Sequence, residues 1–136
     1  MSTRSTIIVK VDDEYHGIYC HFDGYPSNMG PLLLKYYDTQ KEAEELVALG
    51  GLSYLAPRLK PKSGEQHTFN SPNHDITLAY HRDRGEPWEQ NKPEVHYDIN
   101  KIDFQEYVYV FKDDDWYLYD DGEFALLKEV YRNKEH

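Results

Sequence analysis

The chain has 136 residues, a length that suits one domain, residues 1–136, built around a single hydrophobic core. Its net charge of -10 argues against a protein that binds duplex nucleic acid, which needs Lys and Arg to contact phosphates, while thirteen Tyr, five Phe and two Trp supply apolar area for a core. The single cysteine, Cys20, excludes an intramolecular disulfide, and the lack of a long apolar run argues against a membrane span, so we expect a soluble protein in a reducing compartment.

Two β-strands, at residues 6–11 and 15–22, are predicted at the start of the chain, because β-branched and aromatic residues flank a short acidic turn. We expect Val11 to pair with His16. This register gathers on one face Ile7, Val9, Ile18, Cys20 and Phe22. The thiol of Cys20 is therefore expected to be buried and unreactive.

Two short helices are predicted next. A turn at residues 23–26 precedes the first, and Asp38 or Thr39 can cap the second, which Gly50 ends. The inner face of the second helix is expected to comprise Ala43, Leu46, Val47 and Leu49. These helices would cover one face of a sheet.

The middle of the chain, residues 56–75, is rich in Pro, Ser, Asn and Gly and has no periodicity, so it is predicted as a long surface loop. Short strands are expected at residues 76–80 and 95–99.

A hairpin with aromatic residues on both faces is predicted from residues 107–111 and 116–119. Residues 123–132 form a closing strand or helix, and residues 133–136 a disordered tail. The predicted fold is α+β, with an antiparallel sheet built from hairpins and two short helices packed on one face.

Several stretches are distinctive beyond their secondary structure. They are MSTRS at the start, YCHFDGYPSNMG, ALGGLSYL, TLAYHRDRGE, EYVYVF and WYLY. Together they resemble a family of small uncharacterised proteins encoded by phages and prophages. The resemblance implies a phage source and a host-cytoplasm setting, but this family has no established activity and so implies no catalytic residues.

Two His-x-Asp steps form the first candidate site. His21 and Asp23 follow an apolar run, and so do His81 and Asp83; in an extended chain, residues two apart share a face. Two imidazoles and two carboxylates suit a divalent transition metal, which makes a metal-dependent hydrolase one alternative. The simpler interpretation is that each Asp accepts backbone hydrogen bonds in a turn, and we expect neither a metal nor a cofactor.

The second candidate is an anion site around Arg82 and Arg84, with Trp88 nearby as a stacking surface. Guanidinium groups suit phosphate oxygens, and aromatic rings stack on bases. Ion pairs with surface acids are the competing explanation. The full set of residues predicted to bind a ligand is Tyr19, His21, Asp23, Tyr25, His81, Arg82, Asp83, Arg84 and Trp88.

The third candidate is an acidic, aromatic surface around the last hairpin. It comprises Asp113, Asp114, Asp115, Asp120 and Asp121, with Trp116, Tyr117 and Tyr119 between them. Such a surface could bind a basic host protein as a nucleic-acid mimic does, although acidic turns that maintain solubility have the same composition.

These candidates rank three functions. The first is a phage-encoded, non-enzymatic binding protein that counters host defence by sequestering a small phosphorylated ligand, such as a nucleotide signal. The second is an acidic inhibitor of a host defence protein, and the third is the metal-dependent hydrolase; the ranking is by analogy with small phage proteins. The expected partner is a small anionic ligand or a basic host protein, not duplex nucleic acid or a membrane, and a homo-oligomer is left open.

Overall fold

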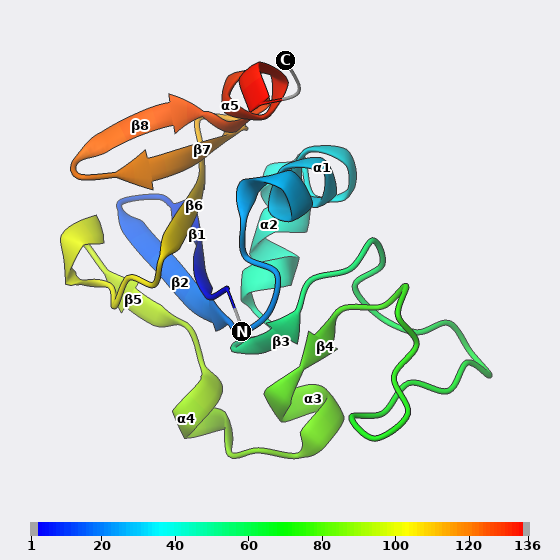
Figure 1. Ribbon diagram of the computed structural model, residues 1–136. Helices are drawn as coiled ribbons and strands as arrows, with labels where there is room; N and C mark the ends of the chain where they lie inside the picture. Colours follow the sequence, from blue (N-terminus) through cyan, green and yellow to red (C-terminus); the bar gives the residue numbers. More distant parts are fainter. Residues whose placement is uncertain (1–2, 135–136) are drawn as a thin grey trace.

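The computed structural model describes residues 3–134, and in that range one sheet carries helices on one face (Figure 1). The strands are β1 (Ser5–Val11), β2 (Glu14–Cys20), β3 (Leu52–Tyr54), β4 (Leu78–Ala79), β5 (Glu94–His96), β6 (Tyr107–Lys112), β7 (Asp115–Asp120) and β8 (Glu123–Leu126). The helices are α1 (Pro26–Tyr36), α2 (Gln40–Val47), α3 (Tyr80–Arg84), α4 (Trp88–Asn91), the 3-10 helix η1 (Ile99–Lys101) and α5 (Leu127–Lys134). The α+β class is thus confirmed.

The sheet is mixed, so the prediction of an antiparallel sheet is wrong. Its order is β4-β3-β2-β1-β6-β7-β8, with β5 also paired to β2. The β1–β6 and β2–β3 pairs are parallel, and the other pairs are antiparallel. A hairpin turn forces antiparallel pairing, whereas β1 and β6 are joined through most of the chain, which can return in either direction.

The β1–β2 hairpin has a tighter turn than expected. Val11 pairs with Glu14 rather than with His16, because Asp12 adopts a positive φ of 55° and closes a two-residue turn. A shift of two residues preserves the faces of a strand, so the predicted apolar residues still meet in one cluster, apart from Phe22. Phe22 lies beyond β2 and is 43% exposed.

The main core lies between the sheet and helices α1, α2 and α5, so the two predicted helices do share a face and a third joins them (Figure 1). Its largest fully buried side chains include Ile7, Met29, Leu33, Leu46, Tyr109, Phe111, Trp116 and Leu127. The indole of Trp116 donates to the carbonyl oxygen of Tyr37 at 2.8 Å, which ties β7 to the end of α1. A smaller core on the opposite face contains Ile8, Ile99, Ile102, Val108, Val110 and Tyr119.

The second helix follows its predicted signals. Thr39 caps α2 by accepting from the backbone of Glu42 at 3.1 Å, and Gly50, with a φ of 81°, turns the chain after it. The strand expected at residues 95–99 is β5, displaced toward the N-terminus.

The strand expected at residues 76–80 is reduced to Leu78–Ala79, and the chain then turns into helix α3. Gly85, with a φ of 79°, ends that helix in the left-handed conformation that glycine favours.

The C-terminal segment is both a strand and a helix, β8 followed by α5. Of the tail predicted at residues 133–136, the first two residues belong to α5, and residues 135–136 lie outside the described range.

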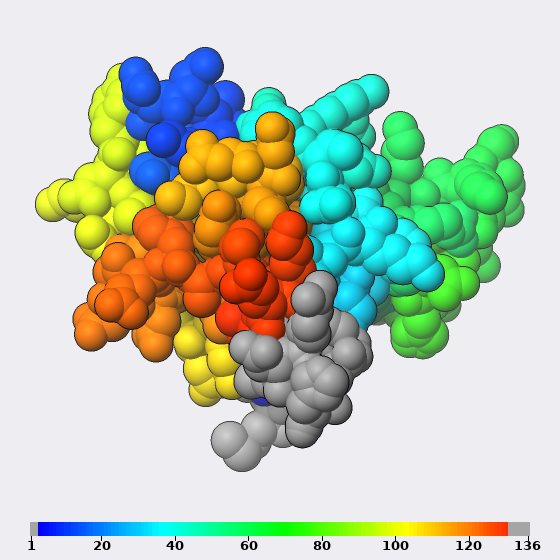
Figure 2. All heavy atoms as spheres, turned by 90° about the horizontal axis from the view of Figure 1, so that it is seen from above, coloured from blue at the N-terminus to red at the C-terminus, as the bar shows by residue number. Residues whose placement is uncertain are grey.

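Residues 56–75, the predicted loop, contain no regular strand or helix. Figure 2 shows this segment in green at the edge of the molecule, beside the cyan helices α1 and α2. Arg58 forms an isolated bridge with Ile76, which holds the start and the end of the segment together.

Candidate ligand-binding site

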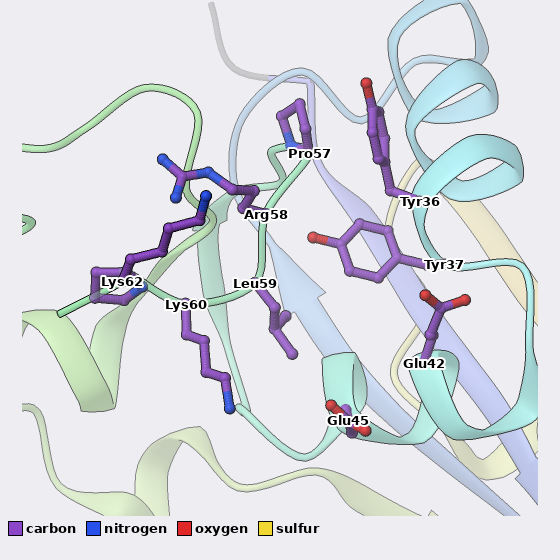
Figure 3. Close-up of a pocket in the computed structure, with 10 residues that line it drawn as sticks. Tyr36, Tyr37, Glu42, Glu45, Pro57, Arg58, Leu59, Lys60 and Lys62 are labelled. Atoms are coloured by element: carbon purple, nitrogen blue, oxygen red, sulfur yellow. The ribbon is translucent and has the colours of Figure 1, made fainter. Parts of the chain in front are cut away.

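A pocket of about 420 Å³ lies between helices α1 and α2 and the first part of the loop (Figure 3). It is lined by Tyr36, Tyr37, Glu42, Glu45, Pro57, Arg58, Leu59, Lys60, Pro61 and Lys62. Its volume falls within the range of about 300 to 1,000 Å³ that is usual for small-molecule sites.

The aromatic wall of the pocket comes from the end of α1. In Figure 3, Tyr36 and Tyr37 lie opposite Pro57 and Leu59. Tyr37 is almost fully buried, and its hydroxyl donates to the carbonyl oxygen of Ala56 at 2.6 Å; burial raises the pKa of this phenol. Tyr37 therefore fixes the wall, and Tyr36 is the more accessible ring.

The basic wall comes from the loop. The Arg58 guanidinium donates to both carboxylate oxygens of Glu65, at 2.7 and 2.8 Å, and the backbone N–H of Lys62 donates to the same carboxylate at 2.7 Å. These contacts lower the pKa of Glu65 to about 2, with the bond from Arg58 as the largest cause. Because Glu65 occupies Arg58, the ammonium groups of Lys60 and Lys62 carry the positive charge that is not in an ion pair within the described residues.

The acidic wall comes from α2. Glu42 and Glu45 lie across the pocket from the charged ends of Arg58 and Lys62 (Figure 3). The hydroxyl of Thr39 donates to one carboxylate oxygen of Glu42 at 3.0 Å. The pocket is therefore bipolar, with lysines on one side and carboxylates on the other.

Arg82 holds the loop that forms the basic wall. Its Nη1 donates to the carbonyl oxygen of Leu59 and its Nη2 to that of Thr77, both at 2.6 Å. Its Nε and Nη2 also donate to Asp83, at 2.9 and 3.0 Å. Since these bonds occupy its fork of donors, Arg82 shapes the pocket from behind rather than facing into it.

Asp83 and His67 complete this support. The Asp83 side chain is 5% exposed, and it accepts from the backbone of Ala79 at 2.8 Å. His67, whose side chain is fully buried, lies 3.5 Å from Asp83 and accepts from the backbone of Asn73 through Nδ1 at 2.9 Å. The proton of the neutral ring is therefore on Nε2, which donates to the carbonyl oxygen of Thr77 at 3.1 Å.

The first His-x-Asp step lies on a different element. His21 follows β2, and its Nδ1 shares a hydrogen bond of 2.5 Å with the Tyr19 hydroxyl. Asp23 is exposed and adopts a φ of 56°, and the exposed ring of Tyr25 comes directly before α1. These four residues surround the turn into α1 and are not among the residues that line the pocket.

The second step is helical, so the expectation that His81 and Asp83 share the face of an extended strand is wrong. Residues two apart on a helix point in different directions. His81 bonds the carbonyl oxygen of Glu86 at 2.7 Å and packs against Trp88, whereas Asp83 faces inward. Arg84 lies 3.3 Å from the Glu86 carboxylate, with its guanidinium 4.8 Å from the ring centroid of Phe69.

The proposed metal ligands are not brought together. Within residues 3–134, no group of three or more His, Cys, Asp and Glu side chains is placed to hold a metal ion. Cys20 is buried beneath the helices, and burial raises the pKa of its thiol to about 12.

The acidic surface is divided. Residues 113–115 lie at the start of β7 and residues 120–121 at its end, roughly 17 Å apart along a strand that rises about 3.3 Å per residue. Positive φ angles at Asp113, Asp114 and Asp121 show that three of these acids serve as turn residues.

Sequence reasoning missed the pocket and selected its supports. The residues of the HRDRG stretch hold the loop from behind, while the ligand-facing groups lie about 20 residues earlier. One signal for them was present, the alternating basic residues Arg58, Lys60 and Lys62 in an otherwise acidic chain. No local signal marks His67.

Comparisons with protein-family models, with curated proteins and with solved structures find no match for this chain. In the part of the chain that the structure describes, no helix has the length and apolar character needed to cross a membrane. The functional argument therefore rests on the pocket and on the chemistry of its walls.

Proposed function

We propose that this chain is a phage-encoded binding protein that counters host defence by sequestering a small phosphorylated ligand, such as a nucleotide signal, in the host cytoplasm. One observation carries the proposal: two lysines, Lys60 and Lys62, line a pocket beside the Tyr36 ring in a chain whose net charge is -10. A local excess of positive groups in an acidic protein supports binding of an anion at that place.

The chemistry of the walls fits a phosphorylated ligand. A lysine ammonium group offers three donors on a flexible stem, and charge-assisted hydrogen bonds to phosphate are stronger than neutral ones. The Tyr36 ring offers a face on which a base can stack. Sequestration requires binding alone, and these groups supply it.

The acidic-inhibitor alternative has weaker support. Its residues fall into two groups at opposite ends of β7, and several of them are explained by the turns that they form. The hydrolase alternative would need His21 and His81 to serve one site, although each already contacts a different partner.

The test is calorimetric titration of the protein with AMP, ADP and cyclic AMP, together with mass spectrometry of the small molecules that it releases on denaturation. We expect at least one of these nucleotides to bind, and Lys60→Ala/Lys62→Ala to weaken that binding at least about tenfold, because each lost charge-assisted bond contributes about 1.5 to 3 kcal/mol.

The matched control is Lys92→Ala/Lys101→Ala, which removes the same charge from exposed positions outside this pocket. Equal loss in both double variants would show that only overall charge matters and would reject the pocket. Absence of nucleotide binding to the wild-type protein, with no phosphorylated molecule released, would reject the function.

A further inference from the structure

The two carboxylates on α2 point to the kind of nucleotide that the pocket takes. Glu42 and Glu45 are three residues apart, and residues at this spacing are neighbours on one face of a helix. Both line the pocket on the side away from Arg58 and Lys62 (Figure 3). A ligand that fills the pocket therefore meets cations at one end and carboxylates at the other.

Both carboxylates retain acceptor capacity. One oxygen of Glu42 accepts from Thr39, while its second oxygen has no hydrogen-bond partner among the described residues. Glu45 lies 4.0 Å from Lys41, and both side chains are largely exposed, so this contact is loose. An ionised carboxylate can only accept hydrogen bonds, so the α2 side of the pocket calls for a donor on the ligand.

A ligand that is anionic throughout satisfies only half of this pocket, because its far end would be repelled by Glu42 and Glu45. A phosphate at one end and N–H donors at the other match both walls. We propose, on the basis of the function proposed above, that the pocket binds a nucleotide whose base carries an exocyclic amino group. The phosphate lies toward Lys60 and Lys62, the base lies against Tyr36, and the amino group donates to a carboxylate of α2.

The test compares AMP with purine riboside 5′-monophosphate, which differs from AMP only in lacking the amino group, and with inorganic pyrophosphate. We expect the wild-type protein to bind AMP at least about tenfold more tightly than either of the others, because one hydrogen bond to a charged acceptor contributes about 1.5 kcal/mol or more.

The Glu42→Gln/Glu45→Gln variant should lose most of the preference for AMP over purine riboside 5′-monophosphate, since the amide is a weaker acceptor than the carboxylate. The control, Glu106→Gln/Glu123→Gln, removes two exposed carboxylates outside the pocket and should keep the preference. Thermal melts establish that both variants are folded.

The outcomes separate the two proposals. If AMP, purine riboside 5′-monophosphate and pyrophosphate bind the wild-type protein equally well, the amino-base inference is wrong, while binding of a phosphorylated ligand stands. A preference for AMP that survives in Glu42→Gln/Glu45→Gln also overturns it. If none of the three compounds binds, both the inference and the proposed function fail.

Discussion

The guanidinium of Arg82 donates to the carbonyl oxygen of Leu59 at 2.6 Å, although the two residues are 23 positions apart in the chain. This bond links the HRDRG stretch to the basic wall of the pocket. It assigns Arg82 to the support of the loop, because its other donors are taken by Thr77 and Asp83. The most conspicuous charged stretch of the sequence thus acts on the pocket indirectly.

Replacement of Arg82 by Ala should destabilise the fold. It removes three contacts and leaves the carboxylate of Asp83, which is 5% exposed, without its partner. Loss of one partner from a buried pair costs about 3 kcal/mol, which corresponds to a fall in Tm of roughly 10 °C for a domain of this size. Calorimetric melts measure it. Arg84→Ala is the control, and because Arg84 is 55% exposed, its Tm should change by only about 1 to 2 °C. Equal falls for both variants would contradict the supporting role of Arg82.

Acid should weaken the contact between Arg58 and Glu65. The pKa of Glu65 in the folded protein is lowered to about 2 from an ordinary value of 4.5. A carboxyl group with a lowered pKa stabilises the folded state fully above its ordinary pKa, and this contribution is lost as the pH falls from about 4.5 toward 2. Urea titrations at pH 7, 4 and 2.5 should show a stability difference between wild type and Glu65→Gln that shrinks with acid. A difference that stays constant over this range would contradict the assignment.

Substitution of Asp114 by Gly should stabilise the β6–β7 hairpin. Asp114 adopts a φ of 62°, where glycine has no steric penalty, and it lies between two other acids. We expect a gain of about 0.5 kcal/mol in the free energy of unfolding, measured by urea titration. Asp13→Gly is the matched control: Asp13 occupies the β1–β2 turn without a positive φ, so glycine there should destabilise. Stabilisation by both substitutions would point to the loss of charge rather than to backbone conformation.

Two glycines with similar backbone angles separate conformational strain from steric overlap. Gly50 has a φ of 81° and Gly64 a φ of 87°. A Cβ at position 50 would overlap the carbonyl oxygen of Asn91, whereas at position 64 it would meet nothing within 4 Å. Gly64→Ala should therefore lose about 1 kcal/mol, and Gly50→Ala roughly 2 kcal/mol more. Urea titrations measure both, and equal losses would mean that the overlap is relieved by a small shift of α4.

The sequence by itself determined the elements whose signals lie within a few residues of one another. Alternating apolar residues in β1 and β2 defined their faces even though the register moved by two, since side-chain direction repeats every two residues. Thr39 and Gly50 marked the limits of α2, because capping depends on neighbouring backbone groups.

Tertiary structure alone decided the parallel β1–β6 pair, the helical form of residues 80–84 and the pocket. Parallel pairing places Ser5 beside Tyr107, and no local pattern specifies a partner at that distance. The HRDRG stretch became a helix where Asp83 could accept from Ala79 and Arg82 could reach Leu59, so bonds to a distant loop outweighed the strand pattern before it. The pocket likewise exists only where α1 and α2 meet residues 57–62. A site formed between separate segments depends on how the whole chain packs, and a reading of each segment alone does not contain that information.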